Sequence, residues 1–287
     1  MLVLQEVFAK PWSDYPPVGH EVTDRSELPA AEFWQEAIGA IRRTFPDFLF
    51  MAEVYWGLES RLQQLGFDFT YDKRLYDHLV ARNALAVQTH LLYASEQFVD
   101  RGVHFLENHD EARVAALLTT DEHQAAAAVI VGLPGMCLLH EGQLTGARQR
   151  LSVHLGRRIL ELEQSGIAMF YAKLLKVIQR TAVRRGKAFL LRPREAWAGN
   201  PTAVNFVIVQ WQSMSESFDL IVTNLADHRS QCIVDLNGEA IGRYQWQMKD
   251  ILGTEEFVRE GQELGERGLF LDVPAQSVQL FRFAGRS

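Results

Sequence analysis

Short apolar runs alternate with longer helix-like segments through the first two thirds of the chain, and this alternation restricts the fold more than any other feature. The apolar runs cover residues 48–55, 66–71, 102–106 and 135–139. Segments of helical composition cover residues 30–44, 75–98, 121–131 and 167–184. Strands that alternate with helices of about ten or more residues are typical of βαβ units, whose strands are parallel. We therefore predict a parallel α/β region.

The pattern changes near Arg185, after which only short strand-like runs occur. They cover residues 188–191, 203–211, 218–223, 231–236, 269–273 and 278–283, with turn-forming pairs such as Asn237-Gly238 between them. Such spacing is typical of an antiparallel β-sandwich or barrel. We predict two domains, residues 1–185 and 186–287.

Composition excludes several classes of protein. The 287 residues can bury a sizeable core, and 47% hydrophobic and 23% charged residues are ordinary for a globular chain. The net charge of −7 disfavours nucleic acid or an anionic membrane surface as a partner. The sequence has no apolar run near the roughly 18 residues of a membrane-spanning helix and no signal-peptide pattern at Met1, so we expect a cytoplasmic protein.

Cysteine and histidine spacing predicts no cofactor and no metal site. Cys137 and Cys232 lie far apart in the sequence, and we interpret them as two buried thiols rather than a disulfide. The histidines His104 and His140 lie within predicted strands, which favours core or rim positions over metal ligation.

Two carboxylates lie at the ends of predicted strands. Glu53 ends the run FLFMAE and is followed by Tyr55 and Trp56, while Asp110 follows a strand in FLENHDEAR. The carboxyl ends of parallel barrel strands form the active-site face, and glycoside hydrolysis uses carboxylates together with aromatic side chains. Each residue alone has a simpler interpretation, since Glu53 could be a solvated charge and Asp110 a helix cap.

Three segments in order resemble the α-amylase family of glycoside hydrolases. FLFMAEVYW resembles the segment on the fifth barrel strand, and GVHFLENHDEAR resembles the one on the seventh. LPGMCLLHEGQLTGARQRLSVHLGRR is similar to the eighth strand and its loop, although Leu144 replaces a glutamate that is usual there. The closing GLFLDVPAQSVQLFRF resembles the C-terminal sandwich of these enzymes.

The resemblance implies an α/β fold, the C-terminal half of a (β/α)8 TIM barrel, followed by an all-β antiparallel sandwich domain. It implies retaining hydrolysis or transfer at the α-glucosidic bonds of an α-glucan or α-glucoside. Glu53 would then be the general acid/base and Asp110 the transition-state stabiliser. The residues expected to shape the sugar pocket are Asn108, His109, Tyr55 and Trp56, and Arg113 is counted with these substrate-binding residues as the one that orients nearby carboxylates.

The family's two earlier segments, Asp-x-x-x-Asn-His and Arg-x-Asp with the nucleophile, have no match in the sequence. The opening MLVLQEVFAKPW resembles the family's segment directly after the nucleophile, so we expect a truncated gene, a misassigned start or a split enzyme, inactive alone. Glu6 and Asp14 are weak substitutes because neither ends a predicted strand. The alternatives are a non-catalytic glucan-binding or interaction protein, or a subunit that needs a complementing N-terminal half. Self-association through open sheet edges is also expected.

Overall fold

The computed structural model describes residues 32–152, 154, 157, 159–214 and 216–286. Glu6, Asp14 and the opening segment therefore lie outside the described residues, as do residues 30 and 31 of the first predicted helix. No helix in the described ranges is long and apolar enough to cross a membrane.

The first region is built on a four-stranded parallel sheet in the order β1-β2-β3-β4, as the alternation predicted. Its strands are shorter than the apolar runs that contain them, because only a few residues of each run hydrogen-bond to a neighbour. The strands are β1 (Met51–Ala52), β2 (Phe69–Tyr71), β3 (Gly102–Phe105) and β4 (Met136–Leu138).

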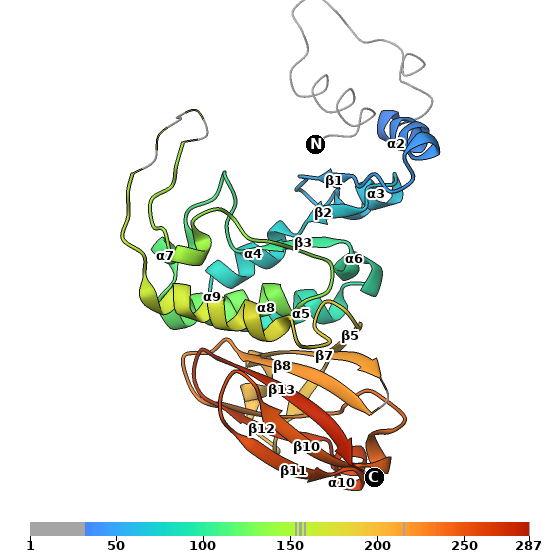
Figure 1. Ribbon diagram of the computed structural model, residues 1–287, viewed down its shortest axis with the longest axis vertical. Coiled ribbons are helices and arrows are strands. Elements are labelled where there is room, and N and C mark those ends of the chain that lie inside the picture. The colour runs from blue at the N-terminus through green and yellow to red at the C-terminus, as the bar shows by residue number, and fades with distance from the viewer. Residues whose placement is uncertain (1–31, 153, 155–156, 158, 215, 287) are drawn as a thin grey trace, which may run out of the picture.

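Helices alternate with these strands (Figure 1). The segment at residues 75–98, predicted as one helical stretch, forms parts of three helices. The backbone turns left-handed at Arg82 (φ 58°), and the side chains of Asn83 and Ser95 then cap new helices. The helices are α2 (Phe33–Thr44), α3 (Glu59–Gln64), α4 (Lys73–Val80), α5 (Ala84–Tyr93), α6 (Glu96–Asp100), α7 (Val114–Leu117), α8 (Thr120–Gly132) and α9 (Ser165–Ile178), with a 3-10 turn η2 (Gln143–Thr145).

The second region consists of two antiparallel sheets. A six-stranded sheet has the order β11-β10-β13-β8-β7-β5, and a three-stranded sheet has the order β12-β9-β6. The strands are β5 (Lys187–Leu191), β6 (Pro193–Glu195), β7 (Phe206–Met214), β8 (Ser217–Asn224), β9 (Ser230–Val234), β10 (Gln245–Asp250), β11 (Glu256–Glu260), β12 (Leu269–Val273) and β13 (Ser277–Arg286). Three short helices, η3 (Pro201–Asn205), η4 (Ile241–Arg243) and α10 (Gly261–Arg267), connect them.

An aromatic core lies between the two antiparallel sheets. Phe218 and Phe283 stack with ring centroids 4.3 Å apart, and Trp246 packs edge-on against Phe218. Leu271 and Val273 of the three-stranded sheet belong to the same buried cluster. Alternate residues of each strand point to this core, as expected for sheets that face one another.

The opposite face of the six-stranded sheet is covered by α5, α8 and α9, which lie between it and the parallel sheet (Figure 1). Trp211 donates its indole N–H to the Gly132 carbonyl at 2.7 Å. A Cβ at Gly132 would lie 2.8 Å from Ile221 Cδ1, so helix and sheet approach closely. One apolar core therefore continues from the helices of the first region into the second.

Candidate functional site

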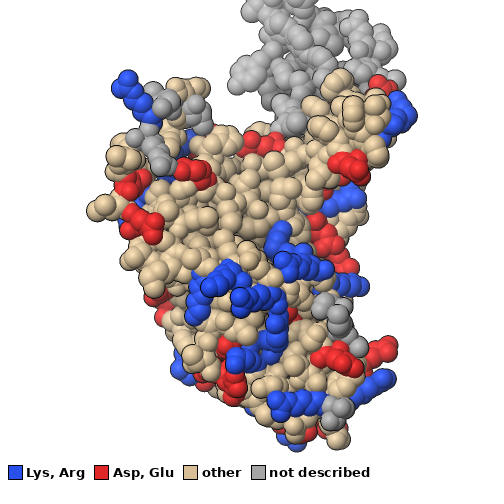
Figure 2. All heavy atoms as spheres, viewed as in Figure 1, with Lys and Arg blue, Asp and Glu red and all other residues tan. Residues whose placement is uncertain are grey.

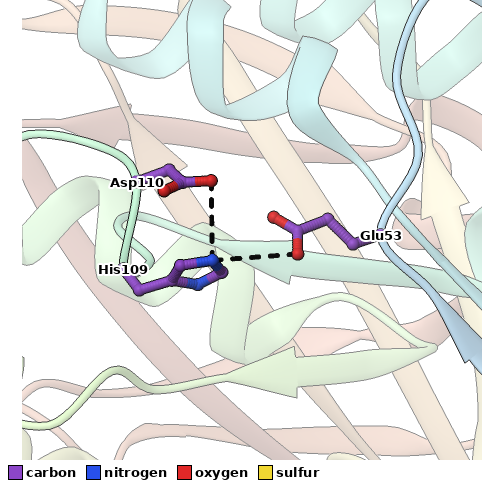
Figure 3. Close-up of side chains that lie close together, drawn as sticks. All are labelled: Glu53, His109 and Asp110. Carbon is purple, nitrogen blue, oxygen red and sulfur yellow. Dashed lines mark ion pairs between the residues drawn. The ribbon is translucent and has the colours of Figure 1, made fainter. Parts of the chain in front are cut away.

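The carboxyl ends of β1 and β3 bring Glu53, His109 and Asp110 together (Figure 3). Glu53 directly follows β1, and His109 and Asp110 lie in the loop after β3. The Nε2 atom of His109 lies 3.9 Å from Glu53 Oε2 and 3.5 Å from Asp110 Oδ2. All three side chains are partly exposed, with 36%, 46% and 57% exposure for Glu53, His109 and Asp110. This proximity follows from the parallel arrangement, because the strands of one parallel sheet end at the same edge and only β2 separates β1 from β3.

The Tyr55 hydroxyl orients the Glu53 carboxylate. This hydroxyl donates to Glu53 Oε1 at 2.8 Å. Burial raises the pKa of Tyr55 above its ordinary value, and the hydrogen bond to Glu53 raises it further. Tyr55 therefore remains a protonated donor at neutral pH, which orients one oxygen of Glu53.

Trp56, beside this pair, combines an unfavourable backbone conformation with an exposed ring. Its side chain is 74% exposed, and its ring meets that of Tyr55 edge-on at 5.8 Å. Its φ of 66° lies in the left-handed region, which is unfavourable for a bulky residue. Strain of this kind concentrates at functional sites, and an exposed indole offers a flat apolar surface to a ligand.

Asn108 shapes the loop that carries His109 and Asp110. Its Oδ1 accepts hydrogen bonds from the backbone N–H groups of Asp110 and Glu111, both at 2.9 Å. The side chain is buried, and its Nδ2 has no hydrogen-bond partner among the described residues. The residue acts first as a loop-forming side chain rather than as an exposed surface of the pocket.

Arg113, expected to orient nearby carboxylates, lies inside the protein with 3% of its side chain exposed. Its Nη1 donates to Glu107 Oε1 at 2.6 Å and to the Glu141 carbonyl at 2.6 Å. Its Nε donates to the Gln149 carbonyl at 3.3 Å. None of its described contacts reaches Glu53 or Asp110, so the structure gives Arg113 the surroundings of a positioning residue.

Glu107 and His140 are residues of this site region that the sequence patterns did not assign to it. Glu107 is fully buried, accepts from the Val114 N–H at 2.7 Å and lies 3.2 Å from His140 Nδ1. The signal was present in the sequence, since Glu107 directly precedes Asn108 and His140 follows β4. A glutamate that follows an apolar run is expected to be buried, and a buried carboxylate requires a charged or hydrogen-bonding partner nearby.

A second buried polar cluster lies at the end of β2. Asp72 is 2% exposed, with His90 Nε2 at 2.9 Å and His104 Nδ1 at 3.3 Å. Burial by itself would raise the pKa of Asp72, but the two imidazoles outweigh it and hold the pKa well below its ordinary value. The same carboxylate caps α4 by accepting from the Leu75 N–H. This cluster therefore stabilises the strand end rather than facing a ligand.

The spacing of Glu53, His109 and Asp110 also suits a metal ion, which the sequence did not predict. One ligand atom from each residue lies within 4.8 Å of the others. The sequence spacing concealed this arrangement because the ligands come from two different strand ends. His109 pairing with both carboxylates accounts for the same geometry without an ion. The charges of Glu53 and Asp110 also act on Tyr71, whose pKa is raised first by burial and then by these two carboxylates.

Comparisons with known proteins agree with the resemblance seen in the sequence. No family model matches the sequence, and no curated protein matches it. Several solved structures, however, match the fold of this chain. An α-amylase from Geobacillus thermoleovorans, complexed with acarbose, superposes with a TM-score of 0.66 at 15% identity, over 89% of this chain and 57% of that chain.

Two further structures match over a similar share. A maltogenic α-amylase from Thermotoga neapolitana gives a TM-score of 0.63 at 17% identity, covering 88% of this chain and 58% of its own. A debranching enzyme from Nostoc punctiforme, soaked with acarbose, gives 0.62 at 17% identity, covering 91% and 55%. The chain therefore has the fold of part of an α-amylase-type enzyme, and it spans little more than half the length of these structures.

Proposed function

We propose that the chain forms part of a retaining glycosidase site that acts on α-glucosidic bonds. The observation that carries this proposal is the convergence of Glu53, His109 and Asp110 at the carboxyl ends of parallel strands, within an α-amylase-type fold. We further propose that β1 to β4 are half of an eight-stranded barrel and that the antiparallel sheets form an appended sandwich domain.

Glu53 serves as the general acid/base in this proposal. It is partly exposed and oriented by Tyr55, so its second oxygen can exchange a proton with a glycosidic oxygen. Asp110 places a negative charge near the sugar, where it stabilises the oxocarbenium-like transition state. His109, close to both carboxylates, donates to a sugar hydroxyl, and Trp56 supplies a stacking surface.

A retaining reaction also needs a carboxylate nucleophile, about 5–5.5 Å from the acid/base. The resemblance leaves that residue without a match in the 287 residues. We therefore propose that this polypeptide alone has no turnover and that the nucleophile comes from elsewhere. Catalytic residues that act as a unit fail together, so loss of one removes nearly all activity.

One further observation fits a barrel that additional parallel strands complete. In the described ranges, β1 and β4 each pair with a single neighbour. Apolar side chains beside β1 are also exposed: Phe45 (61%), Phe48 (52%), Leu49 (63%) and Met51 (43%). Open parallel edges flanked by exposed apolar groups fit a polypeptide that contributes further parallel strands.

Two measurements test the proposed function. Purified protein incubated with maltooligosaccharides and a nitrophenyl α-glucoside should release no product above the blank. Robust turnover that disappears in Glu53→Gln would show that the chain supplies its own nucleophile. In nuclear magnetic resonance titrations, maltotriose should shift the Trp56 and His109 resonances, and less so in Asp110→Asn. If maltotriose shifts neither residue, the site does not bind α-glucans.

A further inference from the structure

Between η2 and α9, residues 147–152 and 159–164 form the two limbs of an excursion that extends away from the body of the protein (Figure 1). Its described part carries three exposed arginines, Arg148, Arg150 and Arg157, although the whole chain is acidic. Figure 2 shows a basic side chain projecting at this place, above acidic side chains nearer the body. The same segment also contains Glu161 and Glu163, so the feature to explain is the position of individual arginines beside an acidic site.

The base of the excursion is held in place. The Glu161 carboxylate accepts from the backbone N–H groups of Arg148 at 2.8 Å and Gln149 at 3.1 Å, which ties the two limbs together. The Gln164 N–H donates to the Thr145 carbonyl at 2.9 Å. Arg150 therefore directly follows two residues whose backbone is anchored.

Arg113 connects the anchored start of the excursion, at Gln149, to the site. Its buried guanidinium bonds at once to Glu107, which precedes Asn108 and His109, and to the Gln149 carbonyl, which precedes Arg150. Removing a partner from such a buried pair leaves an uncompensated charge, so the pair resists opening. Arg113 therefore sets the position of Arg150 relative to the loop that carries Asp110.

Arg150 forms a long, exposed ion pair with Asp110. The Arg150 Nη2 atom is 4.0 Å from Asp110 Oδ1, which is longer than a hydrogen bond. Both side chains are more than half exposed. The planar guanidinium thus keeps donors available at the mouth of the site, in the geometry that matches a phosphate group.

A neutral glucan gains no charge–charge attraction from Arg150, whereas a negatively charged sugar does. Glu53 and Asp110 repel a negatively charged ligand, and a positive charge near them offsets that repulsion. We infer that Arg150 determines which sugars the site accepts, by holding a phosphate group of the ligand beside Asp110, with Arg113 as its positioning residue. This inference rests on the proposed function, because it concerns the same sugar site.

Ligand titrations at constant ionic strength, followed through the Trp56 indole resonance, test the inference without requiring turnover. Maltose 1-phosphate should bind about tenfold more tightly than maltose, the gain expected from a charge-assisted guanidinium–phosphate contact. In Arg150→Gln the two ligands should bind alike. Arg267→Gln is the matched control, since Arg267 is an exposed arginine on α10 and should leave the preference intact.

The outcomes separate this inference from the proposed function. Equal affinities in the unaltered protein, or a phosphate preference that survives in Arg150→Gln, would overturn the inference while maltose binding still supports a glucan site. Inorganic phosphate that binds as tightly as maltose 1-phosphate would also overturn it, because the anion alone would then be recognised. Binding of neither sugar would overturn both.

Discussion

The parallel and antiparallel regions hold their strands in different ways. The four parallel strands contain two to four residues each, and the sheet has two open edges in the described structure. The antiparallel strands reach ten residues in β13, which pairs along most of its length with β8 on one side and β10 on the other. The candidate chemistry lies in the region with the shorter ladders.

This difference shows how the fold divides stability from function. The site needs strand ends and loops, which few backbone hydrogen bonds hold, so buried side-chain clusters such as Arg113–Glu107 secure them. In the antiparallel sheets, long ladders and the aromatic core stand beside buried polar groups such as Asp219, which accepts from Arg282 and from the Ala182 N–H. The six-stranded sheet in turn supports α8 and α9, which back the parallel strands.

The largest effect is expected in the aromatic core. Phe283→Ala should lower the free energy of unfolding by about 3–5 kcal/mol, because Phe283 is fully buried and stacks on Phe218. Denaturant unfolding followed by circular dichroism measures this loss. Phe270→Ala, on an exposed position of β12, should cost under about 1 kcal/mol. Equal losses in both variants would contradict the assignment of stability to this core.

The next effect concerns Asp72 in the parallel region. Asp72→Asn should cost roughly 3 kcal/mol, because it removes the buried carboxylate that holds His90, His104 and the Leu75 N–H together. The exposed Asp77→Asn on the same helix should cost under about 1 kcal/mol.

The pH dependence of this stabilisation follows from the sign of the pKa shift. The folded pKa of Asp72 lies below that of the unfolded chain, so its contribution is present above about pH 4 and is lost as the pH falls through the folded pKa. Melting temperatures measured from pH 7 down to pH 3 should therefore fall more steeply in the unaltered protein than in Asp72→Asn. Parallel curves would contradict the sign.

A smaller effect tests the contact between the two regions. Gly132→Ala should destabilise the protein by about 1–3 kcal/mol, because its Cβ would lie 2.8 Å from Ile221 Cδ1 and that buried side chain would have to shift within the packed core. Gly39→Ala, in α2 with nothing within 4 Å of its Cβ, should instead stabilise by roughly 0.5–1 kcal/mol. A stabilising Gly132→Ala would mean that the regions pack loosely.

The smallest effect concerns strain at the site. Trp56→Gly should raise the free energy of unfolding by about 1 kcal/mol, because glycine adopts φ 66° freely and the exposed indole packs little. Trp197→Gly should give no gain, since Trp197 is exposed but has no positive φ. A destabilised Trp56→Gly would show that the indole ring contributes to the fold rather than awaiting a ligand.

Sequence patterns predicted some elements and missed others for identifiable reasons. The four parallel strands were predicted because each is a compact apolar run between helical segments. Strands β10 and β11 were missed, since charged residues such as Lys249, Glu256 and Arg259 interrupt their apolar positions. Residues 203–205, predicted as strand, lie in the 3-10 turn η3, which Asn200 caps by accepting from the Thr202 N–H.

The sequence by itself determined the order and type of the parallel strands and the placement of Glu53 and Asp110 at their ends, because these features depend on local periodicity and chain order. Only the tertiary structure decided that Arg113 is buried against Glu107, that Tyr55 orients Glu53, and that Arg150 lies beside Asp110. It also decided that helices cover the second face of the six-stranded sheet. Such contacts join residues distant in sequence or depend on side-chain burial, and burial is set by how whole layers pack rather than by any local pattern.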